Sequence, residues 1–102
     1  LIPAHAQDFL KLGEWTDHPT DVTLTEEGQP VDKIQFLLSG SADVRVNNKL
    51  ITTIHDGSMV GEMAWISNMP ASATVTTNEA SRVFSIDVVK LHKFLALALQ
   101  TN

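Results

Sequence analysis

The chain has 102 residues, a net charge of −5 and no cysteine. This length supports one domain with a modest core, and the lack of cysteine excludes disulfides and thiolate metal sites. The seven basic residues are scattered, so we expect no nucleic-acid partner, because a phosphate-binding surface needs clustered Lys and Arg. No apolar run approaches the roughly 20 residues of a membrane-spanning helix, so we expect no membrane insertion by this segment and a cytoplasmic location.

The N-terminal part, residues 1–20, is predicted to contain a short helix and a polar connector. The helix covers residues 2–12, and its apolar side is formed by Ala6, Phe9 and Leu10. Gly13 is a predicted helix cap, and the polar residues 17–20 favour a connector. Because the chain begins with Leu1 rather than Met, we expect it to be a fragment of a longer protein.

From residue 21 to residue 86 the pattern changes to short strands separated by turns. The predicted strands are residues 22–25, 34–39, 42–46, 50–54, 73–77 and 82–86. Turns are predicted at Gly28, Gly40 and Gly57 and at the Asn47–Asn48 pair. Many short strands bracketed by helices predict a mainly β fold, a double-stranded β-helix or jelly-roll β-barrel with short N-terminal and C-terminal helices.

A final helix is predicted over residues 87–102, with Asp87 as its N-cap. Its apolar face consists of Val88, Leu91, Leu95 and Ala98. The run from Leu95 to Leu99 is apolar almost all round, which a one-sided surface helix does not need. We therefore expect this helix to pack on the barrel and also on a second copy of the chain or on an attached effector domain.

The stretch from Val60 to Val75 combines a glycine, a carboxylate and a short helix-compatible patch. Gly61 and Glu62 stand at the start of that patch, and a strand-like run begins at Ala73. Unpaired N–H groups at a helix start favour an anion, and a carboxylate accepts hydrogen bonds from sugar hydroxyls. The stretch therefore predicts a pocket for a ligand that carries both an anion and a hydroxyl.

This stretch, residues 60–75, resembles the phosphate-binding cassette of the cyclic nucleotide-binding domain family, of the catabolite-activator and protein kinase A regulatory-subunit type. The family pattern reads roughly Phe-Gly-Glu-Leu-Ala, a short spacer and then Pro-Arg-(Ala/Thr/Ser)-Ala-Thr-Val. The matching residues are Gly61, Glu62, Ala64, Pro70, Ser72, Ala73, Thr74 and Val75. Ala71 stands where the family has the arginine that pairs with the cyclic phosphate, and this degenerate cassette is similar to those of Popeye-like bacterial members.

The resemblance implies one cyclic-nucleotide-binding-like regulatory domain over residues 1–102, with the β-roll at residues 21–86. The ligand-binding residues that it implies are Gly61, Glu62, Met63, Ala64, Ala71, Ser72, Ala73 and Thr74. The implied ligand is cAMP or cGMP, with Glu62 accepting the ribose 2′-hydroxyl. Without the arginine, a charge-assisted contact of about 1.5–3 kcal/mol is absent, which weakens binding by about ten- to a hundredfold.

Each of these residues also has a structural interpretation. Glu62 is equally a first-turn carboxylate that the helix dipole stabilises, and Trp65 is expected in the core rather than in the ligand volume. Substitute cations for the missing arginine are Arg82, Arg45 and Lys49, which we expect to be solvated strand charges. The alternative function is therefore a degenerate, non-binding domain that acts as a packing or dimerisation module.

The four histidines, His5, His18, His55 and His92, do not form a His-x-His metal-binding pattern. No Ser/His/Asp arrangement has recognisable local context. We therefore expect no metal site, no catalytic residues, no cofactor and no enzymatic activity.

Overall fold

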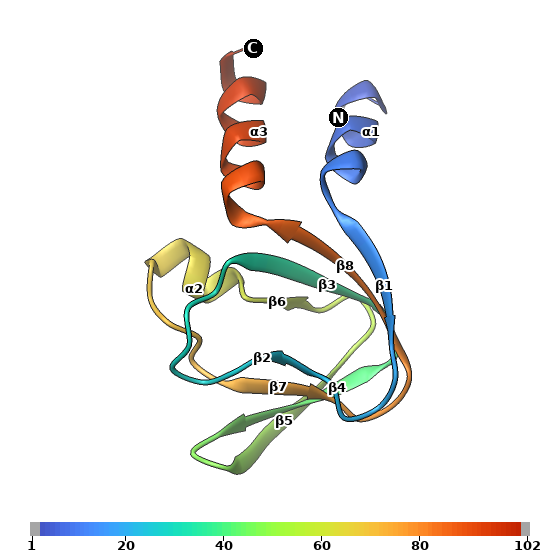
Figure 1. Ribbon diagram of the computed structural model, residues 1–102, viewed down its shortest axis with the longest axis vertical. Coiled ribbons are helices and arrows are strands. Elements are labelled where there is room, and N and C mark those ends of the chain that lie inside the picture. Colours follow the sequence, from blue (N-terminus) through green and yellow to red (C-terminus); the bar gives the residue numbers. More distant parts are fainter. Residues whose placement is uncertain (1–2, 101–102) are drawn as a thin grey trace.

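The computed structural model describes residues 3–100 of the chain (Figure 1). Within this range the helices are α1 (Pro3–Leu12), α2 (Glu62–Ser67) and α3 (Val88–Gln100). The strands are β1 (Glu14–His18), β2 (Thr23–Thr25), β3 (Lys33–Ser39), β4 (Ser41–Val46), β5 (Lys49–His55), β6 (Met59–Val60), β7 (Thr74–Thr77) and β8 (Ser81–Asp87). The predicted helix positions at residue 2 and at residues 101–102 lie outside the described residues, as do the side chains of Ala6 and Ala98.

The strands form two antiparallel four-stranded sheets, and the predicted jelly-roll class is confirmed. One sheet has the order β1-β8-β3-β6 and the other β2-β7-β4-β5. In Figure 1 the helices α1 and α3 stand side by side at one end of these sheets, and α2 lies at the side, where the chain passes from one sheet to the other. Among residues 3–100, no helix has the length and apolar character needed to cross a bilayer.

The strand β1 was not predicted, because its segment was assigned to a helix end and a connector. Glu14–His18 pairs antiparallel with β8 along its whole length, from Glu14 opposite Ser85 to His18 opposite Ser81. Its only large apolar side chain, Trp15, remains 57% exposed, although its ring centroid lies 4.9 Å from that of Phe84. This segment therefore has no alternation of apolar and polar residues that would predict a strand. It forms a strand because the backbone of β8 offers an unpaired edge.

The role predicted for Gly13 as a helix cap is also corrected. Its backbone does not adopt the left-handed conformation, and a Cβ at this position would lie 2.6 Å from the carbonyl oxygen of Ser85. Gly13 is thus needed because the chain passes directly over β8 as it leaves α1. The close approach brings the aromatic side chain of Phe9 to 6.0 Å from Phe84, measured between ring centroids.

Two apolar clusters fill the interior. The first, which we call the helix cluster, consists of buried Ile34, Phe84, Ile86 and Leu91, with Phe9, Phe36, Trp65 and Val88 packed around them. The second, which we call the roll cluster, consists of buried Ala42, Val60 and Val75, with Leu24, Val44 and Ile54 packed around them. The helix cluster joins α1, α2 and α3 to one sheet, while the roll cluster joins strands of both sheets.

The N-cap predicted for the last helix is confirmed. Oδ1 of Asp87 accepts hydrogen bonds from the backbone N–H groups of Val89 at 2.8 Å and Lys90 at 3.1 Å. These are two of the first-turn donors that have no partner inside a helix. The cap fixes the point at which β8 ends and α3 begins.

Replacement of Asp87 by Ala is expected to lower the free energy of unfolding by about 0.5–2 kcal/mol, because both N–H groups lose their acceptor. Asp87→Asn is the matched control, since its side-chain oxygen still accepts, and we expect it to remain close to the native value. Urea denaturation followed by circular dichroism measures both. Equal losses in the two variants would show that the negative charge, rather than the cap, is what stabilises α3.

Candidate functional site

The stretch predicted as a ligand-binding cassette borders a cavity of about 180 Å³, which we call the cassette pocket. Its lining residues are Thr25, Val31, Val44, Ile54, Met59, Val60, Gly61, Glu62, Met63, Ala64, Ala71, Ser72, Ala73 and Val75. They come from β2, β4, β5, β6, β7, the start of α2 and the segments before β3 and before β7. The pocket lies over the roll cluster, because Val60 and Val75 belong to both.

Gly61 shapes the entrance of the chain into α2. Its φ is +95°, and a Cβ would lie 3.0 Å from the carbonyl oxygen of Lys33, so a larger residue is disfavoured by both conformation and space. The carbonyl oxygen of Gly61 accepts a hydrogen bond from the N–H of Trp65 at 3.1 Å. The next residue, Glu62, therefore begins the six-residue helix with its side chain exposed beside the pocket.

Ala71 forms part of the opposite wall and is fixed by its backbone. Its N–H donates to the carbonyl oxygen of Gln29 at 2.9 Å, and its carbonyl oxygen accepts from the N–H of Gly28 at 2.8 Å. The side chain is 8% exposed and lines the pocket. Ala71, which the motif comparison predicts to stand in place of the family's arginine, thus contributes only a methyl group to the lining.

The structure brings seven of the eight predicted ligand-binding residues to this pocket, and Thr74 is the exception. Oγ1 of Thr74 accepts a hydrogen bond from the N–H of Glu27 at 3.0 Å, so this side chain holds the turn after β2 against β7. Sequence reasoning missed the apolar wall from neighbouring strands, which consists of Val31, Val44, Ile54, Met59 and Val60. The alternation of β4 and β5 predicts inward side chains, but not that they meet under the cassette.

Trp65 is the bulky residue that was expected to pack in the core rather than in the ligand volume. It packs against the helix cluster and is not among the residues that line the cassette pocket. The prediction is confirmed, and the indole leaves the cavity open. Trp65 also places α2 in the same apolar cluster as Leu91 of α3.

Two of the basic residues considered as substitutes for the arginine are engaged elsewhere. Arg82 on β8 forms a two-point interaction with Asp17 on β1, with Nε–Oδ1 and Nη2–Oδ2 distances of 2.8 and 3.2 Å. Arg45 lies 3.7 Å from Oδ2 of Asp43. Neither lines the cassette pocket, and Lys49 does not line it either.

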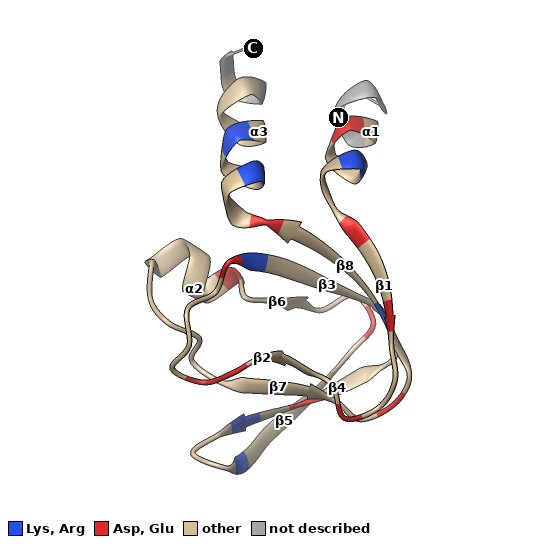
Figure 2. Cartoon of the chain, in the orientation of Figure 1, with Lys and Arg blue, Asp and Glu red and all other residues tan. Residues whose placement is uncertain are grey.

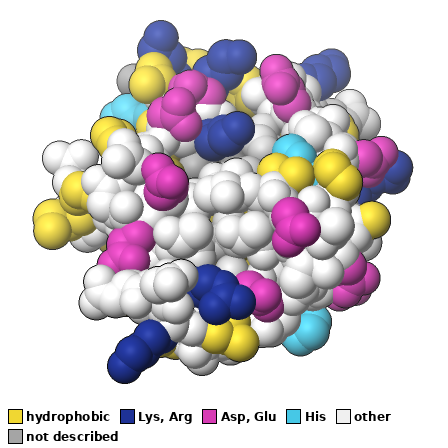
Figure 3. Space-filling model, turned by 60° about the horizontal axis from the view of Figure 1, so that its bottom comes forward, with side chains coloured by type: hydrophobic (Ala, Val, Ile, Leu, Met, Phe, Trp, Pro, Cys, Tyr) yellow, Lys and Arg dark blue, Asp and Glu magenta, His cyan; other side chains and the backbone are white. Residues whose placement is uncertain are grey.

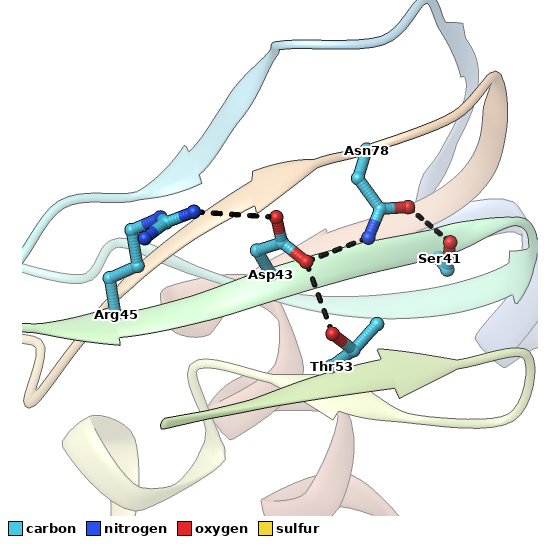
Figure 4. A network of polar contacts seen from close by, with 5 residues as sticks. All are labelled: Ser41, Asp43, Arg45, Thr53 and Asn78. Carbon is cyan, nitrogen blue, oxygen red and sulfur yellow. Dashed lines mark hydrogen bonds and ion pairs between the residues drawn. The ribbon is translucent and has the colours of Figure 1, made fainter. Parts of the chain in front are cut away.

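Figure 4 shows the network that holds Arg45 on β4. Asp43 Oδ1 accepts hydrogen bonds from Asn78 Nδ2 at 2.7 Å and from Thr53 Oγ1 at 3.1 Å, and Asn78 accepts one from Ser41. The carboxylate of Asp43 thus joins β4 to β5 and to the turn before β8. Arg45 is attached to this network by its ion pair, so its position serves the sheet.

The remaining basic residues are also distributed away from the cassette. Figure 2 shows Lys and Arg on α1, α3, β3, β8 and the β4–β5 hairpin, with none on β6, α2 or β7. On the face in Figure 3, they are dispersed among acidic side chains and do not gather into one patch. The backbone carbonyl oxygen of Lys33 lies close to Gly61, but the hollow that Lys33 lines is a separate one, which it shares with the carboxylates of Glu14, Asp32 and Asp87.

Glu62 is the only charged residue that lines the cassette pocket within the described part of the chain. Its carboxylate makes no ion pair and no side-chain hydrogen bond with the groups that the structure describes. Such a carboxylate accepts hydrogen bonds and donates none. The arrangement suits a small ligand that presents hydroxyl or amino donors to Glu62. Residues 3–100 contain no group of three or more His, Asp or Glu arranged to hold a metal ion.

The Asp17–Arg82 pair makes a prediction about titration. The hydrogen bond from Arg82, followed by its positive charge, holds the pKa of Asp17 below its ordinary value of 3.8. Because the folded-state pKa is depressed, the stabilising contribution is present above pH 3.8 and is lost as the pH falls through the lower folded-state value. We expect Arg82→Gln to return the pKa of Asp17 toward 3.8 in a carboxyl carbon NMR titration.

An Asp17 pKa that stays low in Arg82→Gln would contradict the assignment of the shift to this pair. Asp43→Asn is the matched control, because it removes another carboxylate partner of an arginine and leaves Asp17 and Arg82 in place. That variant is expected to leave the titration of Asp17 unchanged.

Known proteins share this sequence pattern and this fold. The model of the cyclic nucleotide-binding domain family matches residues 16–97. The Pycsar effector protein XpPycTIR of Xanthomonas perforans is 32% identical over 71 residues, which are 69% of this chain and 23% of that protein. The chain therefore spans less than a quarter of the length of this curated relative.

Solved structures show the same architecture. A cyclic nucleotide-binding domain from Methylobacillus flagellatus KT has a TM-score of 0.89 and 23% identity, covering 98% of this chain and 59% of its own. The regulatory domain of Toxoplasma gondii PKA, crystallised with cAMP, matches with a TM-score of 0.82 and 17% identity. The match covers 92% of this chain and 38% of the Toxoplasma chain. At these identities the likeness establishes the fold.

Proposed function

Because the chain belongs to the cyclic nucleotide-binding domain family, we propose that it is a regulatory domain that senses a small ligand in the cassette pocket. The observation that carries this proposal is the pocket itself. It lies where the family's cassette is expected, Gly61 forms part of its lining, and Glu62 stands exposed beside it. A cavity of about 180 Å³ is smaller than the roughly 300–1,000 Å³ of pockets that enclose a drug-sized ligand. It therefore receives the sugar end of a nucleotide-sized molecule.

In this proposal Glu62 accepts hydrogen bonds from ribose hydroxyls, as the family resemblance implies. The methyl group of Ala71 supplies no counter-charge for a cyclic phosphate. The missing contact has a value of about 1.5–3 kcal/mol, so cAMP and cGMP bind about ten- to a hundredfold more weakly than with an arginine at this position.

The helix cluster supplies a route from the pocket to the end of the chain. Trp65 of α2 and Leu91 of α3 pack against the same buried side chains, among them Phe84. A ligand that moves α2 therefore shifts the packing of α3, and this change is passed to an attached effector domain or to a second copy of the chain. We place this signalling in the cytoplasm.

A second candidate is a non-binding domain that serves as a packing or dimerisation module. Two observations favour it. Among the described residues, no Lys or Arg lines the cassette pocket. On α3, the side chains of Val89, Leu97 and Leu99 are 57%, 62% and 77% exposed. This candidate predicts that the pocket stays closed to every nucleotide, even when the arginine is restored.

Restoring the arginine separates the two candidates. We expect Ala71→Arg to bind cAMP or cGMP about ten- to a hundredfold more tightly than the native chain, because it supplies the charge-assisted contact to the phosphate. Ala71→Gln is the matched control, since it adds a side chain of similar reach without charge, and we expect no such gain. Isothermal titration calorimetry measures the dissociation constants of all three chains.

Saturable binding by Ala71→Arg below about 100 μM, a free energy of about −5.5 kcal/mol, would support the sensing domain. Absence of binding in a variant that remains folded by circular dichroism would contradict it and would support the packing module. Equal gains for Ala71→Arg and Ala71→Gln would show that bulk, rather than charge, closes the site around the ligand.

A further inference from the structure

We infer that the native cassette pocket selects an uncharged ribonucleoside over a cyclic nucleotide, because Glu62 is the only charged residue in its lining within the part of the chain that the structure describes. The inference rests on the proposed function, in that it takes the same pocket as the binding site. It goes further by naming the chemical class of the ligand. The phosphate, which the family motif is built to hold, is the part of the ligand that this chain is least suited to accept.

The charge of the lining opposes an anion. Of the seven basic residues in the chain, none lines the cassette pocket, and Arg45 and Arg82 already pair with carboxylates on the sheets. A phosphate in this small cavity lies close to the carboxylate of Glu62, and the two negative charges repel each other. Removing a phosphate from water without a partner of opposite charge is unfavourable as well.

The described lining residues also include no set of side-chain donors that could replace a guanidinium group as the partner of a phosphate. The side-chain hydroxyls available are those of Thr25 and Ser72, and Thr25 Oγ1 already donates to the carbonyl oxygen of Ala73 at 3.2 Å. The helix α2 has only six residues, so its start adds little to the binding of an anion. An anionic ligand therefore finds a few neutral donors and one repelling carboxylate.

The same features suit a ribose with free hydroxyls. Glu62 is an acceptor without a partner among residues 3–100, and the 2′- and 3′-hydroxyl groups of a ribonucleoside are donors that fit it. Hydrogen bonds to a charged acceptor are about twice as strong as those between neutral groups. A ligand with a vicinal diol and no negative charge gains this contact without the repulsion.

The rest of the lining favours an aromatic base. Met59 and Met63 border the pocket and are 42% and 65% exposed, so their flexible thioether side chains remain available at its margin. Thioether sulfur atoms make favourable contacts with aromatic rings. Val31, Val44 and Ile54 continue this apolar surface inside the pocket. The sugar thus lies beside Glu62 and the base lies against methionine and aliphatic side chains.

The test is a titration of the native chain with adenosine, guanosine, cAMP and cGMP by isothermal calorimetry. We expect the better of the two nucleosides to bind at least tenfold more tightly than its cyclic 3′,5′-phosphate. The 2′-deoxynucleoside is expected to bind at least tenfold more weakly than the ribonucleoside. Backbone amide NMR must place the binding at Gly61, Glu62 and Ala73.

Variants separate the role of charge from the role of shape. Glu62→Gln keeps the size of the side chain and removes its charge, so we expect nucleoside binding to weaken and the nucleoside preference to shrink to about threefold or less. Ala71→Arg is expected to invert the preference in favour of the cyclic nucleotide. Lys33→Gln is the matched control for a basic residue outside the pocket, and we expect it to leave the native preference unchanged.

Several results would overturn the inference. Equal or tighter binding of cAMP or cGMP by the native chain would show that a cation not seen in the lining serves the phosphate, and loss of that binding in Lys33→Gln would identify it. If the native chain binds no nucleoside while Ala71→Arg binds a cyclic nucleotide, the inference is wrong and the sensing pocket stands. If no variant binds either class, the proposed function fails with it.

Discussion

The structure depends on the packing of Trp65 and Leu91 against one buried cluster around Phe84. This contact joins the short helix of the cassette to the long helix at the end of the chain. It keeps the indole of Trp65 away from the cassette pocket, so a cavity remains between Glu62 and Ala71. It also leaves α3 without a second packing surface on the sheets, and Leu97 and Leu99 remain largely exposed.

Charge is the second constraint. Each arginine in the described part of the chain pairs with a carboxylate on its own sheet, Arg45 with Asp43 and Arg82 with Asp17. These pairs are exposed or half-buried, and such pairs contribute little to stability. Their consequence for function is larger, because both arginines are paired on the sheets and neither neutralises the negative charge of Glu62 in the pocket. In the proposed site the position that the motif comparison assigns to the family's arginine is Ala71, whose methyl group adds no positive charge to this lining.

Much of the fold was predictable because local signals and family resemblance agreed. Alternation predicted β4, the β-branched run after the Asn47–Asn48 turn predicted β5, and Asp87 predicted the start of α3. The cassette motif predicted that Gly61 and Glu62 belong to the site, and both line the pocket. Local signals failed where tertiary contacts decide. The strand β1 has no buried alternation of its own and forms on the edge of β8.

The same limit applies to the site. The hydroxyl of Thr74 fits the family motif, but its hydrogen bond from Glu27 is made across the fold and is invisible in the sequence. The apolar wall was missed because Val44, Ile54 and Met59 come from three strands that meet only in the folded chain. The family motif drew attention to Ala71. Whether one of the seven basic residues replaces the arginine could be judged only from their positions in the folded chain, and none of them lines the pocket.

The most direct measurement of the central claim is a backbone amide NMR spectrum with and without saturating ligand, with a nucleoside for the native 102-residue chain and a cyclic nucleotide for Ala71→Arg. The claim is that the cassette pocket is a ligand site joined to α3 through the helix cluster. It predicts shifts at Gly61, Glu62 and Ala73, and a second group at Trp65 and Leu91 that a Trp65→Leu variant reduces. Spectra that are unchanged in both chains, or shifts confined to residues outside both groups, would contradict it.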